Sequence, residues 1–363
     1  MTDTTTDTAG AAVPAQGPGE GPGEGQEAAD ILAAARAHVD PELRAAVDSL
    51  PGAMRRVARY HLGYEHADGT PATGNGGKAI RPALVLAAVR ALGGEEKTAF
   101  RAAAAVELTH NFTLLHDDVM DRDTTRRHRP TAWTVFGDAA AILTGDAMQA
   151  LAQRMFADDP HPAAREAAIR LALCVEELCE GQFMDCSLES RAPDQVTLDE
   201  TLVMAEAKTG ALLGCACAIG GLYAGAGREE ADALDGFGRQ AGLAFQLIDD
   251  VIGIWGDPGR TGKPAGADLT ARKKSLPVVA ALTSGTPAAA ELAELYGGPP
   301  GADDDEPART AGAVERAGGR DWAQAHAADR MSRAIGLLAR AVPDPESAGG
   351  LLALAEFVTR RTH

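Results

Sequence analysis

Two short stretches place paired carboxylates directly after apolar runs. The first, "LLHDDVMD", contains Asp117, Asp118 and Asp121, and the second, "FQLIDDVIGIWGD", contains Asp249 and Asp250. Residues four apart lie on one face of a helix, so Asp117 and Asp121 would point the same way. Carboxylates held this close repel one another unless a cation lies between them, and oxygen ligands of this kind suit Mg²⁺. One such stretch alone is more often a solvated helix end.

Basic residues in glycine-rich or polar settings accompany the two acidic stretches. They are Lys78, Arg81, Arg126, Arg127, Lys208, Lys263, Lys273 and Lys274. A diphosphate needs both kinds of group, because Mg²⁺ bridges it to carboxylates while basic side chains neutralise its remaining oxygens. The two acidic stretches lie about 130 residues apart, so they would meet only across a folded bundle.

Several motifs, taken together and in order, resemble those of the trans-isoprenyl diphosphate synthases of the polyprenyl synthetase family. They are GGKxxRP at Gly76–Pro82, HDDxxDxxxxRR at His116–Arg127, GD at Gly145–Asp146, GQ at Gly181–Gln182, KT at Lys208–Thr209, FQxxDD at Phe245–Asp250 and GKPxGxDL at Gly262–Leu269. The resemblance covers roughly Leu50 to Leu282. It implies an all-α fold, the isoprenoid synthase type I helical bundle around a central cavity.

The resemblance also implies the reaction and its cofactor. An enzyme of this family condenses isopentenyl diphosphate with an allylic diphosphate to give an all-trans prenyl diphosphate, and it uses Mg²⁺, with three ions expected per active site. Asp117, Asp121 and Asp249 would hold the metal. No side-chain nucleophile is required, because the released diphosphate itself can accept the final proton.

Each basic or polar motif residue then has an implied ligand. Arg126, Lys208 and Lys263 would neutralise the allylic diphosphate. Isopentenyl diphosphate would bind Lys78, Arg81, His110 and Arg127. Lys208, Thr209 and Gln246 would steady the released diphosphate. His116 and Asp146 are expected to support the structure, and Asp118 to point away from the metal.

Two residues before the first acidic motif are expected to limit product length. A growing prenyl chain would run down the helix from Asp117, past Thr113 and Phe112. One aromatic beside a small Thr predicts an intermediate product, geranylgeranyl diphosphate, with farnesyl diphosphate as the close alternative. Phe112 could instead be a core residue, since its spacing also fits the apolar stripe of Leu108 and Leu115.

The chain departs from the family pattern at two places. Gly253 stands where the second DDxxD motif usually has its last Asp, and His128 follows the paired arginines in place of a Gly. The next acid, Asp257, lies too far along a helix to share a cation with Asp250, unless the helix ends first. The first departure puts the third metal position in doubt, and we expect Gly253→Asp to be tolerated.

Two other functions use the same scaffold. A class I terpene cyclase would ionise a long prenyl diphosphate without condensing it, and Gly253 slightly favours that reading. Lys78, Arg81 and Arg127 oppose it, because a cyclase binds no isopentenyl diphosphate. A non-catalytic partner subunit of another synthase is less favoured, since it could lose its metal-binding acids freely.

Composition sets the remaining expectations. The 363 residues carry a net charge of −18, which argues against a nucleic-acid partner, and no apolar run predicts a membrane span.

Residues 1–29 are predicted to be a disordered tail without a signal peptide. Residues 30–363 are predicted to form a single domain with a flexible loop near 297–312. The five cysteines are expected to be reduced and buried. We therefore expect a cytoplasmic enzyme and, by resemblance, a homodimer.

Overall fold

The computed structural model describes residues 24–72, 77–257, 266–298 and 305–359, and these ranges fold almost entirely into helices. The regular strands within them are β1 (Thr125–Arg126) and β2 (Arg129–Pro130), which pair antiparallel. The all-α class predicted from the sequence is confirmed.

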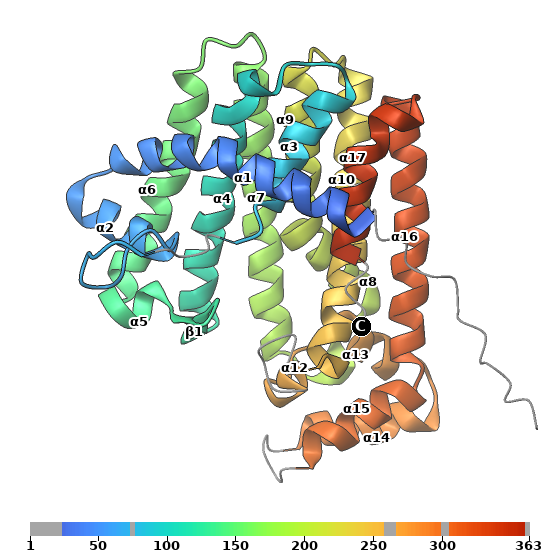
Figure 1. Ribbon diagram of the computed structural model, residues 1–363. Coiled ribbons are helices and arrows are strands. Elements are labelled where there is room, and N and C mark those ends of the chain that lie inside the picture. The colour runs from blue at the N-terminus through green and yellow to red at the C-terminus, as the bar shows by residue number, and fades with distance from the viewer. Residues whose placement is uncertain (1–23, 73–76, 258–265, 299–304, 360–363) are drawn as a thin grey trace, which may run out of the picture.

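The first half of the chain supplies one side of the bundle. Its helices are α1 (Glu24–Asp48), α2 (Gly52–His61), α3 (Ile80–Ala91), α4 (Phe100–Met120), α5 (Ala132–Phe136), α6 (Asp138–Ala157) and α7 (Ala164–Ser190). Short 3₁₀ turns at Glu96–Ala99 and Pro193–Gln195 precede α4 and α8. Helix α1 crosses over the other helices of this half in Figure 1.

The second half surrounds a long helix, α10. Its elements are α8 (Leu198–Ala205), a π-helical segment (Glu206–Gly210), α9 (Ala211–Tyr223), α10 (Arg228–Trp255), α12 (Ala267–Thr270), α13 (Leu276–Leu282), α14 (Pro287–Gly297), α15 (Glu306–Arg316), α16 (Gly319–Ala341) and α17 (Pro345–Thr359). Helix α10 packs most extensively against α16 and α9, and α4 packs against α6.

Helix α9 is the centre of the core. Its sequence, "ALLGCACAIGGLY", has no charged residue, and nearly all of it is buried between α3, α7 and α10. A helix that is apolar on every side must be covered on every side. The stretch Leu198–Tyr223, which includes α9, is long and apolar enough to cross a membrane, but 67% of its most apolar window is buried in the bundle. We therefore assign it to the core.

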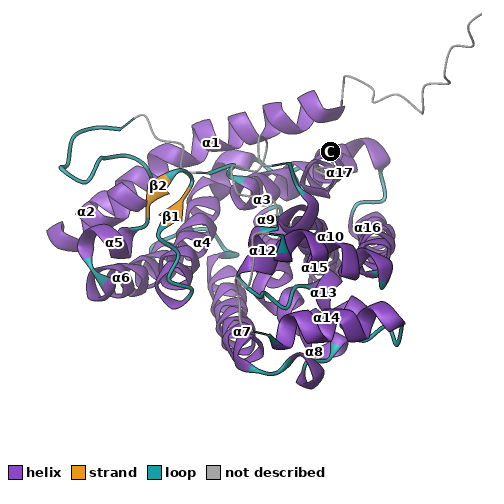
Figure 2. Ribbon diagram, turned by 90° about the horizontal axis from the view of Figure 1, so that it is seen from below, coloured by secondary structure: helices purple, strands orange, loops and turns teal. Residues whose placement is uncertain are grey.

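Helices α4 and α10 carry the two acidic motifs. The predicted stripe on α4 is confirmed: Leu108, Phe112, Leu115 and Val119 are all buried. Both helices end at the lower side of the molecule in Figure 1, near β1 and α12. The view from below in Figure 2 shows these ends together with α7, α12 and α13. The fold thus brings the distant acidic motifs to one end of the bundle.

Two predicted boundaries need correction. Helix α1 begins at Glu24, so residues 24–29 are helical and do not belong to a disordered tail; residues 1–23 lie outside the described ranges. Helix α14 reaches Gly297 and α15 begins at Glu306, so much of the predicted loop near 297–312 is helical. The Pro and acid content there marks helix ends, because Pro287 and Pro307 lie in first turns, where a missing N–H is tolerated.

Candidate functional site

A cavity of about 1460 Å³ opens at the end of the bundle where α4 and α10 terminate. Its walls come from α3, α4, α7, the π-helical segment, α10 and the segment after α12. Most of the predicted site residues line it: Lys78, Arg81, His110, Thr113, Asp117, Asp121, Arg126, Arg127, Lys208, Thr209, Gln246 and Asp249. Lys263 lies outside the described residues.

Asp117 and Asp121, here called the first acidic bank, lie at the end of α4. Asp117 is in the last turn and Asp121 is the residue at which the helix ends. The pKa of Asp117 is raised to about 6, chiefly by burial, with Lys208 opposing the shift and Asp121 adding to it. Burial also raises the pKa of Asp121. Two crowded, partly desolvated carboxylates of this kind favour a bound cation.

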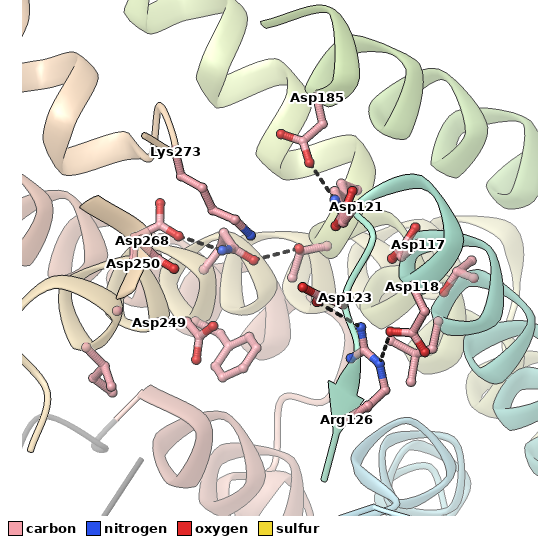
Figure 3. Close-up of a pocket in the computed structure, with 18 of the residues that line it drawn as sticks. Asp117, Asp118, Asp121, Asp123, Arg126, Asp185, Asp249, Asp250, Asp268 and Lys273 are labelled. Carbon is pink, nitrogen blue, oxygen red and sulfur yellow. Dashed lines mark hydrogen bonds and ion pairs between the residues drawn. The ribbon is translucent and has the colours of Figure 1, made fainter. Parts of the chain in front are cut away.

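Asp118 has a different environment, as expected. It is 1% exposed, and its Oδ1 accepts a hydrogen bond from Nε of Arg126 at 2.6 Å (Figure 3). Arg126 follows on β1, and the turn between β1 and β2 is Arg127–His128, whose φ angles are +52° and +61°. Both central residues of this two-residue turn have positive φ, which explains why a Gly would suit position 128. The ion pair fixes the hairpin and its arginines beside the cavity.

The second acidic bank lies at the end of α10, and its two aspartates also differ. Asp249 lines the cavity. Asp250 is buried, and its two oxygens accept hydrogen bonds from Nε2 of Gln246 at 2.7 Å and from the backbone N–H of Leu276 at 2.9 Å. Burial raises the pKa of Asp250 to about 7, although these hydrogen bonds oppose the shift. Asp250 therefore joins α10 to the start of α13.

Lys208 and Thr209 lie on the π-helical segment between α8 and α9. The ammonium of Lys208 contacts Oδ2 of Asp185 at 2.5 Å. Burial lowers the pKa of Lys208, but Asp185 and Asp117 outweigh burial and raise it above its usual value. Thr209 donates to Oε1 of Gln246 at 2.8 Å. Thr209, Gln246 and Asp250 thus form one hydrogen-bonded chain along the cavity wall.

The GQ motif has a steric role in placing Lys208. A Cβ atom on Gly181 would lie 2.7 Å from the backbone N of Lys208 and 3.0 Å from Cβ of Ala207. Only a glycine therefore lets α7 approach the π-helical segment this closely. A π-helical turn inside a longer helix is rare and often marks a functional site. The GD motif acts similarly, because a side chain at Gly145 would overlap the ring of His116.

A further group of basic residues, here called the basic wall, lines the same cavity. Lys78, Arg81 and Arg127 line it together with His110. Burial lowers the pKa of Arg81, and the Nε of Arg81 has no hydrogen-bond partner among the described residues. Burial and the neighbouring arginines hold the pKa of His110 well below its usual value, so its ring is neutral. A side chain at Gly77 would lie 2.6 Å from Nη2 of Arg127, so this glycine makes room for the guanidinium.

Several lining residues were missed from the sequence. Asp185 follows the GQ motif on α7, and Glu107 precedes His110 by one turn of α4; both spacings are signals that could have found them. His61, at the end of α2, had no motif around it. Burial, with Arg127 and Arg126 nearby, lowers its pKa to about 3.

Two adjacent lysines both line the cavity but make different contacts. Lys273 lines the cavity, and its pKa is raised because Asp268 and Asp121 outweigh the effect of burial. The ammonium of Lys274 donates instead to the carbonyl oxygens of Leu188 at 3.0 Å and Glu189 at 2.9 Å. Lys274 therefore caps the carboxyl end of α7.

The two predicted length-determining residues lie in different places. Thr113 lines the cavity, and its hydroxyl donates to the carbonyl oxygen of His110 at 2.8 Å. Phe112 is buried outside the lining residues, edge-on against the ring of His116 at 4.8 Å between centroids. The role of Phe112 as the floor of the product cavity stays a prediction.

The tolerance of Gly253→Asp stays a prediction, and it requires the end of the Asp268 side chain to move. A Cβ atom on Gly253 would overlap Oδ2 of Asp268 and lie 2.8 Å from its Cγ. Asp257 also lines the cavity, because α10 ends at Trp255 and the chain turns before reaching it.

The cysteine prediction is partly wrong. All five thiols are free, but Cys179 and Cys186 are exposed on α7.

The donor set fits Mg²⁺ bound together with a ligand. In the described ranges no three carboxylates or other ligating groups converge on one point as a ready-made metal site. The acids instead lie on two banks across the cavity, with Asp185 and Asp268 beside them (Figure 3). Mg²⁺ is commonly held by one or two carboxylates plus phosphate oxygens, so this arrangement suits metal ions that a diphosphate helps to coordinate.

The fold and the cavity together define a helical-bundle enzyme for diphosphate substrates, and comparisons with known proteins specify the family. The family model described as polyprenyl synthetase matches residues 70–311. The chain belongs to this family, whose prenyl synthases are generally metal-dependent.

The names of two curated relatives and of one solved structure agree with this family. The chain is 48% identical over 332 residues to the geranylgeranyl diphosphate synthase of Mycobacterium tuberculosis, covering 91% of this chain and 93% of that protein. It is 45% identical to the (2E,6E)-farnesyl diphosphate synthase of Mycobacterium bovis, covering 91% and 92%. The crystal structure of a polyprenyl synthetase from Streptomyces coelicolor has a TM-score of 0.85 and 43% identity, covering 91% of this chain and 98% of that one.

Proposed function

We propose that this protein is a Mg²⁺-dependent prenyltransferase that condenses isopentenyl diphosphate with an allylic diphosphate to give a medium-chain all-trans prenyl diphosphate. The observation that supports this proposal most directly is that one cavity contains two acidic banks and a separate basic wall. Two diphosphates can then bind together, one at the acids with metal and one at the basic wall.

The acidic end would hold the allylic substrate. Asp117 and Asp121 on one bank and Asp249 on the other are the expected ligands of Mg²⁺, for which we propose three ions per site. When bound, the metal stabilises the negative charge that the diphosphate gains as it leaves. Lys208, fixed by Asp185, and Lys273 add positive charge on the same side. Arg126, held by Asp118, is placed to neutralise the oxygens nearest the hairpin.

Chemistry would then proceed without a protein nucleophile. The bond between the allylic carbon and the diphosphate oxygen breaks, and its electron pair leaves with the diphosphate. Apolar lining residues such as Leu114, Met204 and Phe245 exclude water from the allylic cation. The double bond of isopentenyl diphosphate attacks this cation, and the new carbon–carbon bond forms. The proton lost in the last step passes to an oxygen of the released diphosphate.

The basic wall would hold isopentenyl diphosphate. Lys78, Arg81 and Arg127 supply positive charge, and the neutral His110 ring can donate one hydrogen bond. This wall is the observation against a terpene cyclase, which has no second diphosphate to bind. The intact acid banks likewise argue against a non-catalytic subunit.

The product is proposed to be geranylgeranyl diphosphate, with farnesyl diphosphate as the alternative. Relatives named for each product have similar identities to this chain, 48% and 45%. Thr113 in the cavity wall leaves more depth than a large side chain there would leave.

One assay tests the function. Purified protein with Mg²⁺ is incubated with isopentenyl diphosphate plus an allylic diphosphate, and separately with the long allylic substrate alone. Elongated prenyl diphosphates in the first reaction and none of the cyclised hydrocarbons in the second are expected. A cyclic product from the second reaction would assign the cyclase, and no product in either would assign the partner subunit.

A homodimer in the cytoplasm is proposed as well. Most of the exposed large apolar side chains among the described residues lie on α6, α7 and the end of α4: Met120, Ile142, Leu143, Ile169, Leu173 and Phe183. A second copy is the proposed occupant of this apolar surface, because it continues over two neighbouring helices. The net charge and free thiols support the location.

A further inference from the structure

The turn that carries Lys78 has an unusual backbone. Gly77 and Ala79, on either side of Lys78, have φ angles of +104° and +55°. A residue with a side chain rarely adopts a positive φ, so contacts with the rest of the fold must stabilise the turn at Ala79. The turn leads directly into α3, which begins at Ile80 and carries Arg81. The conformation of this turn therefore sets where two cations of the basic wall lie.

A residue of α1 holds this turn. The Nη2 of Arg36 donates a hydrogen bond to the carbonyl oxygen of Gly77. Gly77 also lies against Arg127, whose Nη2 would be 2.6 Å from a Cβ atom at position 77. Helix α1 packs against α3, α4 and α17, so the guanidinium of Arg36 reaches the turn from a fixed support. Gly77 thus touches two arginines, one that binds its carbonyl group and one of the basic wall.

The charge of Arg36 acts on the basic wall. Burial lowers the pKa of Arg127, and the charge of Arg36 adds to the shift. Burial raises the pKa of Glu107, and Arg36 is among the arginines that oppose this shift. Arg36 itself is exposed, and it is not among the described residues that line the cavity. Arg36 and Arg127 repel each other, and an anion bound at the wall offsets that repulsion.

We propose that Arg36 is a positioning residue for the diphosphate bound at the basic wall, because it holds the carbonyl group of Gly77 and thereby keeps Lys78 directed at that ligand. This inference rests on the proposed function, in which the ligand is isopentenyl diphosphate. Arg36 lies outside residues 70–311, so the family model does not assign it. Helix α1 would thus serve the site without lining the cavity.

A double-mutant cycle tests the proposal. The variants are Arg36→Ala, Lys78→Ala and the two together. Arg44→Ala is the matched control, because it removes an arginine and its ion pair with Asp40 from the same helix, outside the cavity lining. Steady-state kinetics gives KM for each substrate. Calorimetry without Mg²⁺ gives the Kd of isopentenyl diphosphate and of inorganic diphosphate, so that binding reports on the basic wall rather than on the acidic banks.

Arg36→Ala is expected to raise KM and Kd for isopentenyl diphosphate about tenfold, the effect of one hydrogen bond with a charged donor. KM for the allylic diphosphate and kcat should stay close to the parent values, because the variant weakens binding of one substrate only. Arg44→Ala should change neither KM. The double variant should bind only slightly more weakly than Lys78→Ala, because a positioning residue has little effect once the residue it positions is gone.

Three results would reject the proposal: Arg36→Ala binding isopentenyl diphosphate as tightly as the parent, losses that add in full in the double variant, or a parent that binds neither diphosphate without Mg²⁺. Equal increases in both KM values would likewise assign Arg36 to general structure. The proposed function survives the first two results as long as the parent makes elongated products. A parent that makes no product would reject the function, while metal-free binding of inorganic diphosphate still reports on Arg36.

Discussion

Adjacent aspartates in each acidic motif serve different purposes, because neighbouring residues on a helix point about 100° apart. Asp117 and Asp249 face the cavity, whereas Asp118 binds Arg126 and Asp250 binds Gln246 and the start of α13. The second aspartate of each pair therefore positions other site residues rather than metal.

Removing a cavity-facing carboxylate should abolish most activity without unfolding the protein. Asp117→Ala and Asp121→Ala are each expected to lower turnover by about a hundredfold or more, since metal stabilisation of the leaving charge is worth several kcal/mol. Steady-state kinetics measures the effect, and the melting temperature of the metal-free variants should not fall. Turnover within a few fold of the parent for both variants would contradict the metal assignment.

Buried acids also predict how stability depends on pH. Asp117 and Asp250 have folded pKa values of about 6 and 7, above the unfolded value of 3.8. Between about pH 4 and pH 7 the folded protein therefore binds more protons than the unfolded chain, so its free energy of unfolding should fall as pH rises. Chemical denaturation of metal-free protein across this range measures the slope.

The slope should be smaller in Asp250→Asn, which cannot titrate. Mg²⁺ with inorganic diphosphate should restore stability at pH 7, because bound metal favours the ionised form of Asp117. A free energy of unfolding that rises steadily between pH 4 and pH 7 in the metal-free parent would contradict the raised pKa values.

Product length is predicted to depend on single side chains near the first motif. If Phe112 is the floor, Phe112→Ala should release longer prenyl diphosphates at similar total turnover, because a growing chain could pass into the space beside His116 and Gly145. Chromatography of the products measures this. An unchanged distribution would place Phe112 in the core and assign the floor to residues such as Thr113.

At the scale of elements, close helix packing places Lys208. Helix α7 and the π-helical segment approach so closely at Gly181 that a single methyl group would overlap the backbone. The segment turns Lys208 toward Asp185 and Thr209 toward Gln246. Packing between these elements therefore decides the geometry of the diphosphate end.

Gly181→Ala should disturb this packing. It is expected to destabilise the protein by about 1–3 kcal/mol, as overpacking usually does, and to reduce turnover as Lys208 shifts. Gly336→Ala in α16 is the matched control, because nothing lies within 4 Å of its added Cβ. The control should leave turnover unchanged and gain up to about 1 kcal/mol from helix propensity. Equal effects of the two substitutions on the free energy of unfolding would reject the packing argument.

At the scale of the whole molecule, the apolar surface on α6 and α7 predicts assembly. Phe183 is 78% exposed, which is unusual for so large an apolar side chain outside an interface. Phe183→Ser should weaken a dimer, and Ile335→Ser on α16 is the control, being 46% exposed away from this surface. Light scattering at micromolar concentration measures the mass. A monomeric parent, or a Phe183→Ser dimer as stable as the parent, would reject the assignment.

The sequence alone determined the fold class, the family and most of the carboxylates and basic residues that the proposed function uses. Helical periodicity and motif spacing are local properties, so Asp117, Asp121 and Asp249 could be assigned to helix ends before their arrangement was known. Composition also indicated the loops and helix ends, although the boundaries near 24–29 and 306–312 were missed because helix caps depend on neighbouring elements.

Only the tertiary structure decided which side chains meet. Lys273 and Lys274 are adjacent and both line the cavity, yet the ammonium of Lys274 donates to carbonyl oxygens at the end of α7, whereas Lys273 lies close to Asp268 and Asp121. Asp185 and Asp268 joined the acids through contacts between distant helices. The carboxylate of Asp268 on α12 lies beside Gly253 of α10, and sequence spacing cannot show this, because the contact joins two separate helices whose packing is decided only in the folded chain.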